Sequence, residues 1–436
     1  MKIGMLTSGG DCQGLNSALR GVAKTLYNEL GSKVTIYGIR DGYRGLIEGA
    51  YHAMSPKDFS DILTLGGTIL GTSRQPFKEM KKAAEDSEET KLEKMLKTVN
   101  EEGFDCLVIL GGNGTHKTAN LLSENGVNVV TLPKTIDNDL WGTEVTFGFQ
   151  SAIDIAATVI DSIHSTAFSH SRVFIVEVMG HKAGWLTLYA GIASGADIIV
   201  IPEIPYSAKA IAKAIQKREQ NGKRFSILAV AEGAISQEEA KMSKKEFKAA
   251  RENMPYPSIS YRIADELKEL TGQEIRVTIP GHYQRGGAPC PADRLLTSRL
   301  GVAAAQLIRE KKYGYMVAVQ NDCIVPVPLK DVAGKLKTVP PDGEVVRAAR
   351  ALGLSMGDYN KGTNRPGGHS TCVSRYAASP AAPIWAAAWN FFRQTKKHPF
   401  RWKGCFRFQI GENLLVVNLS HVLDEHQRLV GVAPLV

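Results

Sequence analysis

Two carboxylates stand two positions apart in the segment PKTIDND (133–139), directly after an apolar run at 127–132. They are Asp137 and Asp139, and Thr135 precedes them. Phosphoryl transfer to an alcohol requires one carboxylate that accepts the hydroxyl proton and another close to a cation, which this spacing can supply. Asp-Asn-Asp is also a favourable turn sequence, so the segment by itself leaves a purely structural role open.

Two glycine-rich turns, TSGGD (7–11) and LGGNGTHKTA (110–119), each follow an apolar run and precede a helical pattern. Glycines let backbone N–H groups approach a phosphate, and the N-terminus of the following helix adds partial positive charge. Neither turn has the GxxxxGK(S/T) or GxGxxG spacing of the common nucleotide-binding motifs. One such turn is often only a tight strand-to-helix connection, but two of them favour phosphate binding.

Several arginines flank glycine-rich segments along the chain. They are Arg74 in GTSRQPF, Arg172 in SHSRVFIVEVMGH, and Arg276 and Arg285 in EIRVTIPGHYQRGG, which also contains His282. A guanidinium binds phosphate with two parallel hydrogen bonds. Any one of these arginines on its own is better explained as a surface ion pair. Together, beside the glycine turns, they favour a phosphorylated substrate.

Short apolar runs alternate with amphipathic patterns over most of the chain. Runs without period-two alternation predict buried parallel strands at 2–6, 106–110, 127–132, 172–178, 198–201, 226–231 and 315–320. Helical spacing predicts helices near 151–164, 208–220 and 295–311. The fold class is therefore α/β, with open, doubly wound, mostly parallel sheets. Ligands of such sheets bind at the carboxyl ends of the strands, where both glycine turns and PKTIDND stand.

The positive charge of the chain is concentrated at its C-terminal end. The 436 residues hold 53 Lys and Arg against 44 Asp and Glu, a net charge of +9, and residues 359–436 hold ten of the basic residues but three of the acidic ones. This part begins with the linker-like YNKGTNRPGGHS and contains three of the five tryptophans. We expect a basic C-terminal extension, in which the aromatic and basic residues around 384–408 form either an anion-binding or interaction module or a poorly folded appendage.

Composition and cysteine spacing exclude several classes of protein. With 43% hydrophobic and 22% charged residues, the chain is neither disordered nor fibrous. Its six cysteines show no zinc-ligand spacing, which favours free thiols in a reducing compartment. The first residues do not resemble a secretory signal, and no apolar run approaches the 18 residues of a membrane span. We expect a cytoplasmic protein without a membrane partner.

The order TSGGD, GTSRQPF, GGNGT, PKTIDND, VEVMGH, AEG and PGHYQRGG resembles the phosphofructokinase family from residue 1 to about 358. The resemblance implies transfer of a phosphoryl group to the 1-hydroxyl of fructose 6-phosphate, giving fructose 1,6-bisphosphate. It also implies a donor-binding domain at 1–148 with about 284–335 and a sugar-phosphate-binding domain at 149–283 with about 336–358. Residues 359–436 lie outside the match.

The resemblance assigns roles to matched residues. Asp137 matches the catalytic base, which needs no strongly raised pKa, with Thr135 beside it and Asp139 indirectly supporting the metal and phosphates. Arg74 matches the arginine that spans the donor and transferred phosphates. The implied donor site comprises Gly10, Arg74, Gln75, Gly112, Asn113, Gly114 and Thr115. The implied sugar-phosphate site comprises Thr135, Ile136, Asp137, Met179, Gly180, His181, Glu232, His282, Tyr283 and Arg285. Arg172 and Arg276 match arginines that reach the 6-phosphate from a neighbouring subunit, which implies a homo-oligomer, a tetramer or dimer.

Three positions depart from the common bacterial pattern. Asn113 stands where a magnesium-associated Asp is usual, and His181 replaces a common Arg. We still expect Mg²⁺, because substrate phosphates are its main ligands in such sites. Gly114 is typical of ATP users, whereas Lys134 is typical of pyrophosphate users. The pair favours ATP as donor, with pyrophosphate as the alternative.

Other classes of function fit the residues less well. NAD kinases and diacylglycerol-type lipid kinases share a GGNGT-like turn but not PKTIDND followed by PGHYQRGG. A non-catalytic, sugar-phosphate-binding regulatory subunit is encouraged by Asn113, but the intact Asp137 and Arg74 argue against it. Only the net charge suggests nucleic acid, which would also require a basic face with stacking aromatics, so we expect no nucleic-acid partner.

Overall fold

The structure is a computed structural model that describes residues 1–85, 87–359, 404–410 and 413–419. The chain divides into two compact units, residues 1–360 and 361–436. Of the second unit, the structure describes the antiparallel strands β12 (Gly404–Ile410) and β13 (Asn413–Leu419). Apart from Tyr359, the predicted linker at 359–370 lies outside the described residues, and so does most of the predicted module at 384–408.

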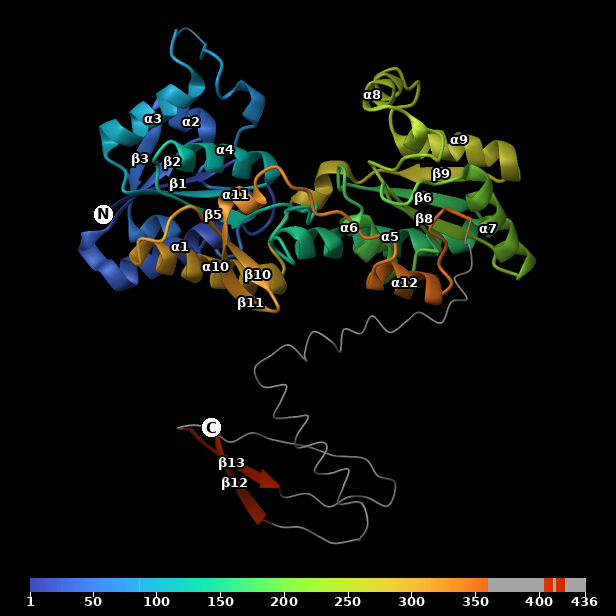
Figure 1. Cartoon of the computed structure of the whole chain (residues 1–436). Helices are drawn as coiled ribbons and strands as arrows, with labels where there is room; N and C mark the ends of the chain where they lie inside the picture. The colour runs from blue at the N-terminus through green and yellow to red at the C-terminus, as the bar shows by residue number, and fades with distance from the viewer. Residues whose placement is uncertain (86, 360–403, 411–412, 420–436) are drawn as a thin grey trace. The chain divides into compact units, whose positions relative to one another are not determined.

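The first unit contains a seven-stranded sheet with the strand order β11-β10-β5-β4-β1-β2-β3 (Figure 1). The strands are β1 (Lys2–Thr7), β2 (Thr35–Ile39), β3 (Tyr51–Met54), β4 (Cys106–Gly111), β5 (Val129–Pro133), β10 (Tyr315–Gln320) and β11 (Cys323–Pro328). The interior pairs are parallel, and only the edge strands β3 and β11 are antiparallel to their neighbours. Its helices are α1 (Leu15–Leu30), α2 (Tyr43–Glu48), α3 (Lys91–Glu102), α4 (Asn113–Glu124), α10 (Pro291–Arg309) and α11 (Leu329–Val332).

A second, four-stranded sheet of the same unit is entirely parallel, with the order β7-β8-β6-β9. Its strands are β6 (Val173–Val178), β7 (Ile198–Val200), β8 (Ser226–Ala231) and β9 (Ile275–Thr278). The helices around it are α5 (Phe149–His170), α6 (Trp185–Ala193), α7 (Ala208–Gln220), α8 (Lys244–Glu252), α9 (Ile259–Thr271) and α12 (Glu344–Ala351).

The interior strands of each sheet are buried on both faces, which explains the continuous apolar runs in the sequence. In β4, for example, Val108 and Leu110 pack with α1 and α10, whereas Leu107 and Ile109 pack with α3 and α4. In β8, Ile227 packs with the cluster that includes α5 and α6, and Leu228 packs with α7 and α9. Helices on both faces therefore leave the strand ends as the accessible part of each sheet.

The predicted fold class is confirmed, since the described part of the chain forms two helix-covered, mostly parallel sheets. Each predicted strand is present to within two residues at either end. The strands β2, β3, β9 and β11 were not among those predicted, because three of them (β3, β9 and β11) are sheet edges and their apolar runs are brief. Among the described residues, no helix has the length and apolar character needed to cross a membrane.

Candidate active site

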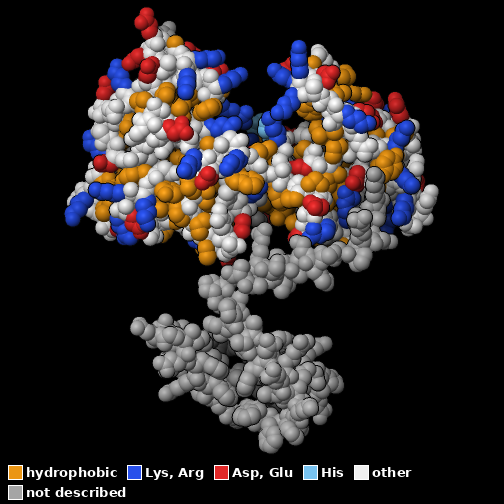
Figure 2. All heavy atoms as spheres, viewed as in Figure 1, with side chains coloured by type: hydrophobic (Ala, Val, Ile, Leu, Met, Phe, Trp, Pro, Cys, Tyr) orange, Lys and Arg blue, Asp and Glu red, His pale blue; other side chains and the backbone are white. Residues whose placement is uncertain are grey.

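The carboxyl ends of the strands in both sheets carry most of the predicted site residues. In the first sheet, β1 leads into TSGGD, β4 into Gly112, and β5 into Lys134 and the loop that follows. In the second, β6 leads into Met179, β8 into Glu232, and β9 into a 3-10 turn at Gly281–Arg285. Figure 2 shows that the molecular surface is hollowed between the two halves of the first unit, with Lys and Arg side chains on both sides of the hollow.

Backbone hydrogen bonds hold the TSGGD turn against the segment that precedes Arg74. The Gly9 N–H donates to the Ser73 carbonyl at 3.0 Å, and Thr72 Oγ1 donates to the Gly9 carbonyl at 2.7 Å. The Arg74 side chain is exposed immediately beyond these bonds. The structure therefore places the predicted phosphate-bridging arginine at the edge of the first glycine turn.

The second glycine turn opens α4 with its backbone donors available. Gly112 directly precedes the helix, and Tyr43 Oη donates to the Thr115 carbonyl at 2.8 Å, which ties the first helical turn to α2. Asn113 Nδ2 donates to the Lys335 carbonyl at 2.5 Å, so this amide group is committed to another segment of the protein. A Cβ atom added at Gly114 would meet nothing within 4 Å. The open space beside Gly114 leaves room for a bulky donor.

Lys134 lies beneath the TSGGD turn. Its side chain is buried, and its Nζ donates a hydrogen bond to the Gly10 carbonyl. Burial lowers the pKa of this ammonium group. The predicted donor-specificity residue thus supports the first glycine turn from inside the protein.

The loop after β5 (residues 135–146), named the catalytic loop for its predicted role, is held by its own polar side chains. Asn138 adopts a left-handed conformation (φ 51°), and its Oδ1 accepts the Thr146 N–H at 3.1 Å. Thr146 Oγ1 donates to the Thr135 carbonyl at 2.7 Å, and the Asp137 N–H donates to Thr135 Oγ1 at 3.0 Å. Asn is among the few non-glycine residues that tolerate this backbone conformation. The sharp reversal places Asp137 and Asp139 on either side of a buried amide.

The Asp137 carboxyl group lies among charged groups from both sheets. Burial, followed in importance by the neighbouring Asp139 carboxylate, raises the pKa of Asp137 to about 7. Glu232 acts in the same direction, whereas Arg285 and Lys134 oppose the rise in pKa. Burial also raises the pKa of Asp139. A carboxyl group that titrates close to neutral pH is well matched to accept a proton from an alcohol.

The loops of the second sheet are joined to the site by two buried glutamines and by Glu232. The Glu232 carboxylate accepts the Gly180 and His181 N–H groups at 3.3 and 2.8 Å. Gln284 Oε1 accepts the Met179 N–H at 3.2 Å, and Gln13 Nε2 donates to the Gln284 carbonyl at 3.1 Å. Sequence reasoning did not single out either glutamine.

Arg285 crosses from the second sheet to the first glycine turn. Its Nη1 donates to the Asp11 carbonyl at 3.0 Å. A Cβ atom at Gly10 would overlap the Arg285 guanidinium, so a side chain at this position would displace Arg285. Arg285, predicted as a sugar-phosphate contact, therefore lies between the donor turn and Asp137.

Arg172 and Arg276 do not lie with the other predicted residues. Arg172 directly precedes β6, so the six residues of that strand, about 20 Å, separate it from Met179. Arg172 Nε pairs with the Glu274 carboxylate at 2.6 Å, and Arg276 on β9 pairs with the same carboxylate. Two arginines and one shared carboxylate leave a net positive cluster at the amino ends of β6 and β9.

The remaining predicted residues differ in exposure. The Ile136 side chain is buried in the core, so any substrate contact at this position is made by its backbone. His282 and Tyr283 are exposed in the 3-10 turn, and Tyr283 is 71% exposed. Gln75 Oε1 accepts a hydrogen bond from Lys91 Nζ at 3.0 Å.

The residues present fit a magnesium ion that is carried by substrate phosphates. In the described ranges, no group of three or more His, Cys, Asp or Glu side chains could hold a metal by itself. Burial raises the pKa of both Asp137 and Asp139, and a nearby cation would relieve this unfavourable burial of two carboxylates. Mg²⁺ characteristically binds through one or two carboxylates, water and phosphate oxygens, which matches this set.

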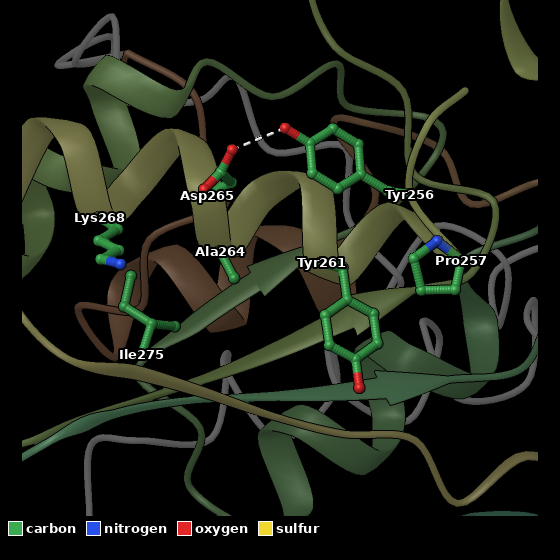
Figure 3. Close-up of a pocket in the computed structure, with 7 residues that line it drawn as sticks. All are labelled: Tyr256, Pro257, Tyr261, Ala264, Asp265, Lys268 and Ile275. Carbon is green, nitrogen blue, oxygen red and sulfur yellow. Dashed lines mark hydrogen bonds between the residues drawn. The ribbon is translucent and has the colours of Figure 1, made fainter. Parts of the chain in front are cut away.

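A shallow pocket on α9 contains none of the predicted site residues (Figure 3). Tyr256, Pro257, Tyr261, Ala264, Asp265, Lys268 and Ile275 line it. Tyr256 Oη donates to Asp265 Oδ2 at 2.7 Å, and Lys268 is the one basic side chain of the lining. The pocket therefore lacks the converging backbone donors and arginines that a phosphate site requires.

Comparison with known proteins agrees with this geometry. The family model described as Phosphofructokinase matches residues 2–308. The chain is 56% identical over 358 residues to a protein of Spirochaeta thermophila named ATP-dependent 6-phosphofructokinase, covering 81% of this chain and 97% of that one. It is 45% identical over 357 residues to ATP-dependent 6-phosphofructokinase 3 of Bacteroides thetaiotaomicron, covering 82% and 100%.

Among solved structures, Pichia pastoris phosphofructokinase in the T-state matches with a TM-score of 0.65 and 32% identity. The match covers 76% of this chain and 35% of the Pichia chain, so this chain spans about a third of that protein. The family match, the curated relatives and the arrangement of loops at the two sheets together show that the chain belongs to the phosphofructokinase family.

Proposed function

We propose that this protein transfers the γ-phosphoryl group of ATP to the 1-hydroxyl of fructose 6-phosphate, giving fructose 1,6-bisphosphate and ADP. The observation that carries the proposal is the position of Asp137. Its half-buried carboxyl group lies between the two glycine turns of the first sheet and the loops of the second, with Arg285 and Glu232 nearby. The relatives that share 45–56% identity are named as ATP-dependent enzymes, which supports the choice of donor.

In the proposed reaction, the 1-hydroxyl oxygen forms a bond to the γ-phosphorus while the bond from that phosphorus to the β–γ bridging oxygen breaks. The hydroxyl proton passes to the Asp137 carboxylate, and ADP leaves. The transition state is loose, so orientation of the hydroxyl and stabilisation of charge contribute most of the catalysis. Mg²⁺, bound mainly to the donor phosphates with Asp139 nearby, would supply charge neutralisation there.

The first sheet provides the donor side of the proposed site. The N–H groups at the start of α4 and that of Gly10 in the TSGGD turn face the phosphates, and Arg74 neutralises charge that develops between donor and acceptor. The second sheet provides the sugar side through the loop that Glu232 holds and through the turn that contains His282, Tyr283 and Arg285. The predicted donor-binding and sugar-phosphate-binding domains divide the site in the same way, except that Arg285 belongs to the predicted donor-binding part.

Pyrophosphate is the second candidate donor, and Lys134 is the residue that favours it. Its buried ammonium donates to Gly10 in the donor turn, close to where a leaving phosphate would lie. The open space beside Gly114 and the names of the relatives favour ATP.

The test of the proposed function is a donor comparison. Purified protein receives fructose 6-phosphate and Mg²⁺ with either ATP or pyrophosphate, and fructose 1,6-bisphosphate is measured by a coupled aldolase assay. We expect turnover with ATP at least tenfold faster than with pyrophosphate at equal concentrations. The reverse preference would make pyrophosphate the donor, and no bisphosphate with either donor would exclude the kinase function.

We also propose that the protein works as a homo-oligomer in the cytoplasm, with Arg172 and Arg276 reaching the 6-phosphate bound to a neighbouring subunit. The separation of these arginines from the other site residues of their own chain supports this arrangement. Because Glu274 pairs with both, the two guanidinium groups are held side by side. Among the described cysteines, Cys12, Cys106, Cys290 and Cys323 are free, which agrees with a reducing compartment.

If each site is built from two subunits, oligomers that mix two different variants should regain activity. Arg172→Ala should raise the KM for fructose 6-phosphate by about tenfold or more, because a charge-assisted phosphate contact contributes about 1.5–3 kcal/mol. Co-expression of Arg172→Ala with Asp137→Asn should restore part of the activity, since one mixed site then has both residues intact. Oligomers that mix, as seen by native mass spectrometry, but regain no activity would show that Arg172 acts within its own chain.

A further inference from the structure

Lys337 bonds to the catalytic loop from a distant part of the sequence. It lies between α11 and α12, 199 residues beyond Asn138. Its Nζ donates to Asn138 Oδ1 at 2.8 Å and to the carbonyls of Thr143 and Glu144 at 2.9 Å each. An ammonium group has three N–H donors, so this loop takes all of them.

The backbone around Lys337 is tied to the same site. The Lys337 N–H donates to the Asp139 carbonyl at 2.8 Å, and its own carbonyl accepts Trp185 Nε1 at 3.1 Å. Lys337 Nζ lies 5.7 Å from the centre of the Trp185 ring, a cation–π arrangement. Neighbouring positions of this connecting segment (335–339) also contact Asn113, through the 335 carbonyl, and Glu203, through the 339 N–H at 2.9 Å. The segment therefore joins the donor side, the catalytic loop and the sugar side.

The bonds of Lys337 converge on the residue that separates the two aspartates. Asn138 reverses the chain between Asp137 and Asp139, and its Oδ1 is shared between Lys337 and the Thr146 N–H. Without the ammonium group, the Thr143 carbonyl would lose its Lys337 hydrogen bond, the Glu144 carbonyl would keep only the Asn138 Nδ2 donor at 3.3 Å, and Asn138 Oδ1 would lose one of its donors. A shift of the loop would then displace the Asp137 carboxylate from the reacting hydroxyl, and a misplacement of about 1 Å can cost about 10²-fold in rate.

We propose that Lys337 is a positioning residue for phosphoryl transfer, holding the catalytic loop so that the Asp137 carboxylate meets the 1-hydroxyl of the sugar. This inference rests on the proposed function, because it concerns the same site. Lys337 itself contacts neither aspartate side chain through a hydrogen bond in the described structure; it acts through Asn138 and the loop backbone.

The first test is Lys337→Met, which keeps the length of the side chain and removes its donors. We expect kcat to fall about 10- to 10²-fold, with both KM values within about threefold of those of the wild type. The reason is that Lys337 positions Asp137 for the transition state but does not contact the substrates. The matched control is Lys330→Met on α11, an exposed lysine changed in the same way, which should keep wild-type kinetics. Unchanged kcat in Lys337→Met would overturn the inference.

A double-mutant cycle with Asp137→Asn separates positioning from general stability. If Lys337 acts through Asp137, Lys337→Met should cost less than about threefold in the Asp137→Asn background. An equal fold-loss in both backgrounds would mean that Lys337 does not act through Asp137, and would overturn the inference. Wild-type protein without kinase activity would instead mean that the proposed function has failed, before Lys337 is tested.

A second variant covers the case in which Lys337→Met does not fold. Asn138→Gly keeps the left-handed backbone available and removes the amide that Lys337 and Thr146 share. We expect the same pattern, a lower kcat with little change in KM and little further loss when Asp137 is already Asn. Retention of wild-type kcat would contradict the role of this contact.

Discussion

Asp137→Asn should lower kcat by about 10²–10⁴-fold, the usual contribution of a positioned general base, with little change in the KM for fructose 6-phosphate. Asn keeps the shape of the side chain but cannot accept the hydroxyl proton. The coupled assay that measures fructose 1,6-bisphosphate detects the loss. A variant that kept kcat within tenfold of the wild type would show that Asp137 is not the base.

The pH profile gives an independent readout of the same group. Because the pKa of Asp137 in the free protein is raised to about 7, chiefly by burial, a large fraction of this carboxyl group is protonated below pH 7. The value of kcat/KM should therefore fall about tenfold for each pH unit below that point. Asp137→Asn should lack this acid limb, whereas titration of the substrate phosphates affects both proteins alike. A wild-type profile that stays flat down to pH 5 would contradict the raised pKa.

The same carboxyl group should lower the stability of the folded protein at higher pH. Its pKa is about 7 in the folded chain against 3.8 for the unperturbed group, so the folded state binds more protons between these values. The free energy of unfolding therefore decreases as pH rises from about 4 to 7. Above pH 7 the stabilisation that comes from protonating Asp137 is fully lost. Asp137→Asn should have a higher Tm than the wild type at pH 8, and the difference should shrink at pH 5, as measured by differential scanning calorimetry.

Gly114→Asp should discriminate strongly against ATP. A Cβ atom at this position meets open space, so the new carboxylate can be accommodated, and an acidic residue in the first turn of α4 is favourable for the helix. Repulsion between two like charges at 4 Å is worth about 1–4 kcal/mol near a protein surface. The kcat/KM for ATP should fall about 10- to several-hundred-fold, whereas the smaller pyrophosphate should lose less.

Gly114→Ala is the matched control for this prediction. It fills the same open space without charge and should keep ATP kinetics close to those of the wild type. If both variants used ATP equally well, the position would not face the donor. If both lost activity to the same extent, the loss would come from side-chain volume rather than from charge.

Much of the candidate site could be predicted because its parts are local in sequence. An apolar run followed by a glycine turn and a helix specifies a strand-end loop, and parallel strands bring such loops to one edge. TSGGD, Gly112 and the catalytic loop accordingly lie at the carboxyl ends of β1, β4 and β5. Gln284 lies inside the motif PGHYQRGG, so the sequence marks its position as part of the site. Nothing in the sequence indicates that its side chain is buried and bonds to the backbone of Met179.

Other features depend on contacts between distant segments. Lys337 and Gln13 carry no local pattern that distinguishes them from surface residues, yet their bonds link segments 199 and 271 residues apart. Arg172 and Met179 are separated because they stand at opposite ends of β6. Only the assembled sheet shows which end of this strand faces the other site residues. Lys134 proved to support the first glycine turn from within the core.

The sequence alone determined the family, the parallel sheets and the residues at the strand ends, because strand runs, turns and motif spacing are encoded within a few neighbouring positions. The tertiary structure decided the pKa of Asp137, the bonds of Lys337 to the catalytic loop, and the distance of Arg172 and Arg276 from the other site residues. Burial and charge at one atom are set by every segment packed around it, and those segments meet only when the chain has folded.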